Sequence, residues 1–295
     1  MEDDWRPQLW CNKLFDDGTE MSPIICPQDA ADAQIVRNAE AGQRILPGIN
    51  LNVQGQISLL KQLGTIWSDC EEKLRWTATQ EESEQGRRFF YDNGSYSWFD
   101  AMSLAALLVH LKPARILAFV DQYQYACFLD IIELLGLGET TTCLFVEPDP
   151  NRLQNYAPLP EGSRHKIVCS NLKILAWTHF EQLQSNDILF VDTTHVAKAG
   201  SDVCRLFGQI LPRLAPNVWA HIHDVFWPFE YPDGWLQEGR SWNELYVLRA
   251  WLQFNNSVEI RLFLNYLWHF SQKECEANFP DSVKNAGGAI WIMKK

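Results

Sequence analysis

Short apolar runs alternate with longer amphipathic stretches from about residue 97 onward. The apolar runs predict strands, and the amphipathic stretches between several of them predict helices. The expected strands are 115–120, 142–146, 165–169, 187–191, 218–223, 258–264 and 289–293, and the expected helices are 101–111, 123–135, 201–214 and 243–254. Because strands and helices alternate, the pattern indicates βαβ units, a parallel sheet and an α/β fold class.

The first 90 residues follow a different pattern. Residues 1–45 are polar and interrupted by Pro and Gly, whereas Val53, Ile57 and Leu60 recur at helical spacing. Gln, Glu and Ser are frequent at 79–86, which indicates a linker or an exposed turn. We therefore expect residues 1–90 to form a helical N-terminal extension or cap, and residues 91–295 to form the α/β domain.

Composition excludes several kinds of partner. The net charge is −12, so the average field repels DNA, and we expect no nucleic-acid partner. No apolar stretch approaches the roughly 20 residues that span a bilayer, and the acidic N-terminus lacks the apolar core of a secretory signal. The eight cysteines contain no CxxC pair, which argues against a structural zinc site. We expect a cytoplasmic protein without disulfides or a membrane partner, and homo-oligomerisation stays open.

Acidic and imidazole side chains follow the expected strands directly. The carboxyl ends of parallel strands share one edge of a sheet, where ligands of such folds bind. Each of these residues taken alone is better explained as a turn former or a helix cap, but the set favours a functional site. Its members are Asp121, Glu147, Asp192, His223 and Asp224.

The stretch 187–254 carries a specific combination of motifs. It contains Asp192, His195, Gly200-Ser201-Asp202 and His221-Ile222-His223-Asp224, and the chain also has LPGINLN at 46–52 and FVEPDPNRL at 145–153. With these motifs the chain resembles the class I S-adenosylmethionine-dependent methyltransferases, in particular a bacterial branch found in sugar and small-molecule biosynthesis clusters.

The resemblance implies a Rossmann-like sheet of seven mostly parallel strands, in which 289–293 is antiparallel and lies beside 258–264. It also implies that Glu147 binds the ribose hydroxyls of S-adenosylmethionine. A carboxylate suits that role because it offers two acceptor oxygens to two neighbouring hydroxyls.

One motif of the resemblance is missing. The family has Glu-x-Gly-x-Gly after the first strand, and the matching positions here are Ala118, Val120 and Gln122. Glycine there allows a tight turn and close approach of the backbone to the cofactor. Three alternatives follow: the cofactor binds in a shifted pose through Asp121 and Gln122, the pocket holds another ligand, or Tyr123 and Tyr125 fill the space in a non-methylating relative. Asp192 is a further candidate for cofactor binding.

The rim also holds groups for proton transfer. His223 or Asp224 is the candidate base that removes a proton from an acceptor hydroxyl, and His195 is a further catalytic candidate. Alternatively, His221 and His223 share one face of a strand and merely pack there, with only His223 reaching the rim. A divalent metal is a second possibility, because imidazole and carboxylate ligands suit Mn, Fe, Zn or Mg. The candidate ligands are Asp192, His195, His223 and Asp224.

An aromatic loop, residues 226–232, follows these groups and forms either a lid over the substrate or part of the core. The sequence as a whole predicts a methyltransferase-like enzyme that transfers a methyl group to the oxygen of a small hydroxylated metabolite. The alternative is a non-methylating descendant that uses the pocket for another reaction, or for binding a ligand or partner.

Overall fold

The structure is a computed structural model that describes residues 16–19, 21–83 and 86–295. Within these residues, one seven-stranded sheet has the order β3-β2-β1-β4-β5-β7-β6. Strands β1 to β5 are parallel, whereas β7 is antiparallel to both β5 and β6. The predicted Rossmann-like sheet and its antiparallel last strand are therefore confirmed. The strands are β1 Arg115–Phe119, β2 Thr142–Glu147, β3 Lys166–Cys169, β4 Ile188–Val191, β5 Trp219–Ile222, β6 Val258–Phe263 and β7 Ile290–Lys294.

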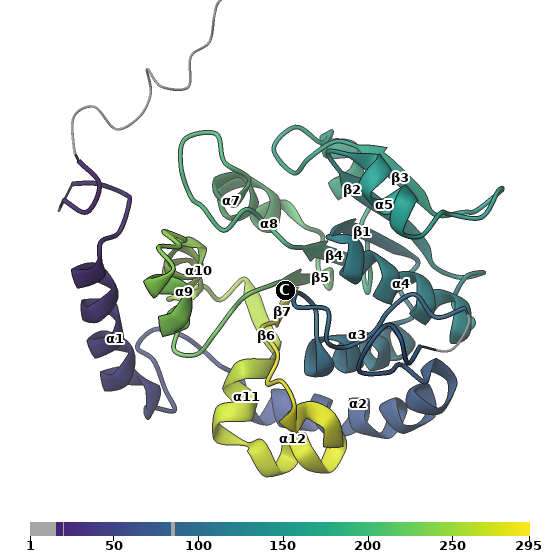
Figure 1. Cartoon of the computed structure of the whole chain (residues 1–295), viewed down its shortest axis with the longest axis horizontal. Helices are drawn as coiled ribbons and strands as arrows, with labels where there is room; N and C mark the ends of the chain where they lie inside the picture. The colour runs from purple at the N-terminus through teal and green to yellow at the C-terminus, as the bar shows by residue number, and fades with distance from the viewer. Residues whose placement is uncertain (1–15, 20, 84–85) are drawn as a thin grey trace, which may run out of the picture.

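Helices cover both faces of this sheet (Figure 1). Helices α2, α3 and α4 pack on the face that receives Ile116 and Ala118, and α7, α8 and α10 pack on the face that receives Leu117 and Phe119. This division follows from the alternation of side chains along β1. The helices are α1 Pro27–Ala41, α2 Val53–Leu74, α3 Trp98–Leu111, α4 Gln122–Leu134, α5 Pro150–Tyr156, α6 Trp177–Glu181, α7 Asp202–Arg205, α8 Leu211–Arg213, α9 Asp233–Gln237, α10 Glu244–Leu252, α11 Leu264–Phe270 and α12 Gln272–Asn278.

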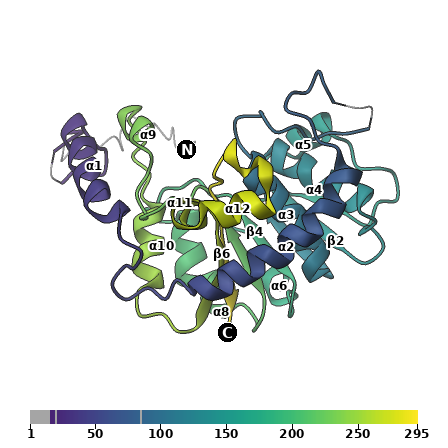
Figure 2. The ribbon, with the colours of Figure 1, turned by 90° about the horizontal axis from the view of Figure 1, so that it is seen from below.

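Two helices lie within the described part of the first 90 residues, and they differ in how many of their side chains are buried. The helix expected at 53–63 continues to Leu74, because Trp67 and Cys70 extend its apolar face, and α2 shares the core of α3 (Figure 2). Helix α1 buries only Ala30 and lies beside α9. An ion pair joins Arg249 to Glu40 of α1 at 2.6 Å. The division into an extension and a domain at residue 90 stays a prediction.

A buried carboxylate joins the segment before α3 to α4. Asp130 is fully buried and accepts hydrogen bonds from the Trp76 indole, from the backbone N–H groups of Arg88 and Phe89, and from the Arg88 guanidinium. Buried polar groups need such partners, since an unpaired one is strongly destabilising. Asp130 therefore fixes the chain that leads to Ser95 at the edge of the sheet.

None of the helices in the described part of the chain combines the length and apolar character required to cross a membrane. The cysteines outside the masked segments are free thiols. Among them Cys169 and Cys204 are exposed, and Cys127 and Cys143 are buried in the core.

Candidate functional site

The strand-end residues predicted from the sequence separate into two groups. Asp192 follows β4 and His223-Asp224 follow β5, and a loop brings His195 to the same place. Asp121 and Glu147 lie at the ends of β1 and β2. The first group converges on one point, whereas Asp121 and Glu147 accept hydrogen bonds mainly from backbone N–H groups of their own chain segments.

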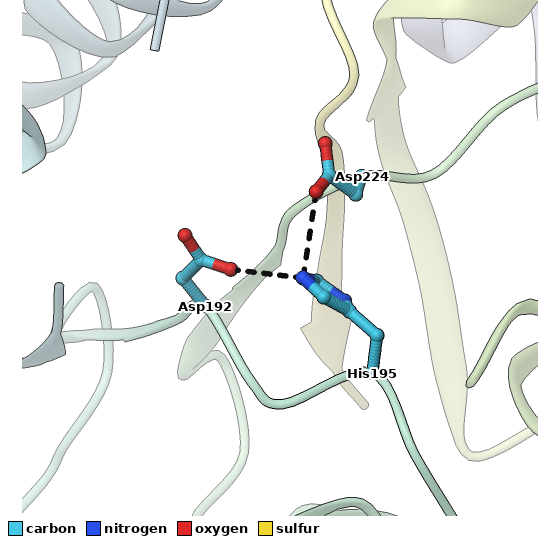
Figure 3. A group of neighbouring side chains, drawn as sticks. All are labelled: Asp192, His195 and Asp224. Atoms are coloured by element: carbon cyan, nitrogen blue, oxygen red, sulfur yellow. Dashed lines mark ion pairs between the residues drawn. The ribbon is translucent and has the colours of Figure 1, made fainter. Parts of the chain in front are cut away.

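His195 lies at the centre of the first group (Figure 3). Its Nε2 is 3.3 Å from Asp192 Oδ1 and 3.4 Å from Asp224 Oδ2. Its Nδ1 is 2.8 Å from Glu244 Oε2, and the imidazole is buried. We call Asp192, His195, Asp224 and Glu244 the His195 cluster. Three carboxylates therefore surround one imidazole.

The loop that carries His195 is fixed by hydrogen bonds to the starts of two helices. Asp202, in the first turn of α7, accepts hydrogen bonds from the backbone N–H and the hydroxyl of Thr194. The carbonyl of His195 accepts from the N–H groups of Asn243 and Glu244, where α10 begins. His195 has a φ of 59°, in the left-handed region, and these contacts hold that conformation. These contacts, from the nearby α7 and the distant α10, aim the imidazole at the strand ends.

Sequence reasoning missed Glu244. An acidic residue in the first turn of a helix is ordinarily explained by the positive end of the helix dipole, so the residue carried no distinct signal. Its burial in contact with His195 and the Thr193 hydroxyl comes only from the position of α10 beside the β4 loop.

Opposite charges shift the pKa values of this cluster. Burial lowers the pKa of His195, but its hydrogen bonds to Asp192 and Glu244 outweigh burial and raise the pKa to about 10. Burial raises the pKa of Asp192, but the His195 hydrogen bond and the charge of His223 outweigh it and lower the pKa to about 2. Gln124 also donates to Asp192 Oδ2 at 2.8 Å. Without a bound cation, the cluster therefore holds an imidazolium at neutral pH.

The two carboxylates that face Nε2 are not equivalent. Burial raises the pKa of Asp224 and outweighs the charge of His223, whereas at Asp192 hydrogen bonds from His195 and Gln124 help to lower the pKa. Asp224 is therefore the better proton acceptor of the two.

His223 lies beside the cluster, with Nε2 3.3 Å from the Ser95 carbonyl oxygen and 3.6 Å from Asp224 Oδ1. Burial lowers the pKa of His223, but the charges of Asp224, Asp192 and Asp100 raise it to about 9. His221 is fully buried and stacks on Phe190 at 3.8 Å. The expectation that both histidines share a face and that only His223 reaches the rim is confirmed.

A cavity of about 540 Å³ adjoins His223 and Asp224. Its lining combines aromatic, acidic and amide side chains with the segment 284–288, which includes Lys284, and its other residues include Trp98, Asp100, Phe226, Trp235 and Asn265. Both oxygens of Asp100 accept from the Gly288 N–H, at 3.1 and 3.0 Å, and burial raises the pKa of Asp100 to about 6. The volume and the mixed lining are typical of a small-molecule site.

The aromatic loop contributes to both the cavity and the core. Phe226 and, beyond the loop, Trp235 line the cavity, whereas Trp227, Phe229 and Tyr231 are buried in the core. The sequence left open whether this loop is a lid over the substrate or part of the core, and each alternative describes part of the segment.

The residues expected to bind a cofactor lie apart from the cavity. Asp121 caps α4 by accepting from the N–H groups of Tyr123 and Gln124 at 2.8 Å, and it also accepts from the Ser95 hydroxyl. The Gln122 side chain accepts from Arg152 at 3.0 Å. Glu147 Oε1 accepts from the Asp149 N–H at 3.1 Å, and its Oε2 makes no hydrogen bond within the described residues. None of Asp121, Gln122 and Glu147 lines the 540 Å³ cavity.

The strand-to-helix junction is short. Only Val120 and Asp121 separate β1 from α4. Tyr125, which the sequence suggested as a filler of the cofactor space, lies instead in the core, where its ring is 4.8 Å from that of Phe145 and its hydroxyl donates to the Ala157 carbonyl. Tyr123 packs edge-on against Tyr156. The physical reason is helical periodicity: Tyr125 falls on the face of α4 that meets the sheet.

The donor atoms of the His195 cluster fit a divalent cation. One ligand atom each from Asp192, His195 and Asp224 lies within 4.8 Å of the others. The hydrogen bond from Nδ1 to Glu244 leaves Nε2 directed at the two carboxylates, as in carboxylate–histidine–metal arrangements. His223, which the sequence also suggested as a ligand, is not in this group.

Residues 123–225 match a family model described as a methyltransferase domain. This match, which covers less than half of the chain, confirms over that segment the resemblance inferred from the sequence. Among curated proteins, no relative matches the chain.

Several solved structures are similar to this chain at low identity. One is an SAH-bound methyltransferase, PaMTH1, from Podospora anserina, with 16% identity, a TM-score of 0.45, and coverage of 93% of this chain and 99% of that chain. Another is the plantazolicin methyltransferase BpumL in complex with SAH, with 12% identity, a TM-score of 0.41, and coverage of 82% and 99%. A third is a putative methyltransferase from Thermobifida fusca YX, with 12% identity, a TM-score of 0.38, and coverage of 65% and 82%. With TM-scores below 0.5, these likenesses carry no information about the ligand of this chain.

Proposed function

We propose that this protein transfers a methyl group from S-adenosylmethionine to a hydroxyl oxygen of a small metabolite. The observation that carries the proposal is the His195 cluster, whose Asp224 lines a cavity of about 540 Å³ at the carboxyl edge of the sheet. The match of 123–225 to a methyltransferase domain supports the reaction class.

The residues fit a divalent cation at Asp192, His195 and Asp224, and we include such a cation in the proposal. When bound there, it would polarise an acceptor hydroxyl and lower the pKa of that hydroxyl. Glu244 holds the imidazole in the tautomer that presents Nε2 to the ligand position. Gln124 fixes the carboxylate of Asp192 through its amide.

The chain's own contribution is alignment and proton transfer. In methyl transfer to oxygen, the acceptor oxygen bonds to the methyl carbon as the sulfur–carbon bond breaks, and the acceptor proton must go to a base. Because His223 is protonated near neutral pH, it acts as a hydrogen-bond donor to the acceptor. Asp224 takes up the proton on Oδ1, which faces His223, whereas its Oδ2 faces His195 and the cation position. Trp98 and Trp235, as cavity walls, shield the reaction from water.

The cofactor would meet Glu147 at its ribose, since the free Oε2 of this carboxylate is available to a hydroxyl. The β1–α4 junction fits less well, because Asp121 already occupies the N–H groups of the first turn of α4. That observation favours a second candidate function, in which the same pocket binds a different ligand and no methyl group is transferred.

Calorimetric titration with S-adenosylmethionine and with its demethylated product, each with and without Mn²⁺, separates the two. A ligand at a hundredfold its dissociation constant stabilises the fold by about 2.7 kcal/mol, which a thermal-shift assay detects. We expect saturable binding of both compounds. Absence of binding at millimolar ligand, in wild-type protein that unfolds cooperatively, would exclude methyl transfer and leave the second candidate.

A further inference from the structure

A second cavity, of about 430 Å³, lies at the opposite edge of the sheet, at the amino ends of β1 and β2. Helix α6 forms one wall, and in Figure 2 this helix lies toward the same end of the molecule as the C terminus. Since β7 is antiparallel to β5, its C-terminal end marks the amino edge of the parallel strands. The cavity is therefore separated from the His195 cluster by the length of the strands.

The floor of this cavity is apolar. Leu117 and Leu183 are buried beneath it, and Leu144 of β2 is only half-buried. Helix α6 has five residues, so it leaves part of this face of β2 open. The sheet thus presents apolar side chains to a solvent-accessible hollow.

The charged side chains of the lining are all basic. They are Arg115, Arg164 and Lys166, and His179 is beside them. Arg115 forms an ion pair with Asp187 at 3.5 Å, and Arg164 donates to the Glu139 carbonyl. Lys166 and His179 form no ion pair with any residue in the described part of the chain. A wholly basic lining is unexpected in a chain with a net charge of −12.

We propose that this cavity binds a small amphipathic anion. Its apolar body lies on Leu117 and Leu144, and its single carboxylate or phosphate head faces Lys166 and Arg164. An inorganic anion would use the cations but leave the apolar floor exposed, and a neutral apolar molecule would leave Lys166 without an ion-pair partner. The volume suits a ligand of this size, and the charge complementarity favours an anion in a protein that repels anions elsewhere.

Isothermal titration of the full chain with octanoate and with octyl phosphate, at low salt, tests the proposal. We expect saturable binding of at least one of them, and octylamine, with the same tail and the opposite charge, not to bind. The comparison of the two anions distinguishes a carboxylate site from a phosphate site.

Charge reversal locates the site. Lys166→Glu should weaken binding of the preferred anion by about tenfold or more, and Arg164→Glu should have a similar effect. The matched control is Lys173→Glu, an exposed lysine outside the cavity lining, which should leave the affinity unchanged. The side chains of Lys166 and Arg164 are both exposed, so the two variants should fold. Thermal unfolding of each variant verifies this.

Three results would overturn the proposal: no saturable binding of either anion up to about 10 mM, well above the range of specific sites; equal binding of octylamine; or equal affinities in Lys166→Glu and Lys173→Glu. Because the readout is binding at the amino edge of the sheet, failure here leaves the proposed methyl transfer unaffected.

Discussion

Glu244→Gln separates the charge of the third carboxylate from its shape. Glu244 Oε2 is 2.8 Å from His195 Nδ1 and accepts from the Thr193 hydroxyl at 2.8 Å. The glutamine amide has the same size, and its oxygen can accept both hydrogen bonds. The substitution therefore keeps the orientation of the imidazole and removes one negative charge from a buried position.

The expected change in metal affinity follows from the contact of Glu244 with His195, a proposed metal ligand. Loss of such a partner lowers metal affinity by about 10- to 100-fold, or about 1.4 to 2.7 kcal/mol. We expect Mn²⁺ titrated into Glu244→Gln to bind correspondingly more weakly than in wild type. Glu133→Gln, an exposed carboxylate on α4, is the control and should bind as wild type does.

Two results would refute this reasoning. If Glu244→Gln binds Mn²⁺ as tightly as wild type while Asp192→Asn abolishes binding, Glu244 does not support the metal site. If the wild-type protein binds no Mn²⁺, the cluster is an imidazolium held by carboxylates, and its contribution is to stability alone. Glu244→Gln would then lower the free energy of unfolding, which urea denaturation measures.

The remaining predictions concern stability and the cofactor. Asp130→Asn should lower the free energy of unfolding by about 2–4 kcal/mol, because a buried charge with four hydrogen-bond donors is lost. Glu133 is the exposed carboxylate that also pairs with Arg88, and Glu133→Gln should change the free energy of unfolding by under about 1 kcal/mol in the same urea titration. Burial raises the pKa of Asp100 from its ordinary value of 3.8 to about 6 in the folded protein. The folded state thus retains this proton between about pH 4 and 6, and stability should fall by up to about 3 kcal/mol as pH rises through that window. Asp100→Asn should flatten the profile, and an unchanged slope would contradict the assignment. Glu147→Ala should weaken S-adenosylmethionine binding by about tenfold; an unchanged dissociation constant would show that the ribose contact is not made.

Several features of the fold follow from local sequence. The strands at 142–147 and 188–191 lie within one residue of the expected ranges, because short apolar runs flanked by turn residues leave little choice of boundary. Asp149 caps α5 and Pro150 is its first residue, as in many helix starts. By contrast, the helix expected at 201–214 is interrupted by a π-helical turn at Leu206–Ile210, which its amphipathic pattern does not reveal.

The candidate site divides in the same way. Strand ends alone placed Asp192, His223 and Asp224 on one rim, because parallel strands β4 and β5 are neighbours and end together. The sequence did not indicate that His195 is the central group of the cluster. His195 reaches the rim because its own backbone is left-handed, and contacts with the start of α10 hold it in that conformation. Glu244 is 49 residues further along the chain from His195, so no local pattern could join the two.

The sequence by itself determined the architecture and the edge of the sheet at which acids and imidazoles gather, since periodicity and strand ends are local properties of the chain. Tertiary structure decided which of those groups meet, which of them serve only as caps, as Asp121 does for α4, and where the cavities open. The reason is that a site depends on distances between segments far apart in the chain, and those distances are set by how helices pack on the sheet.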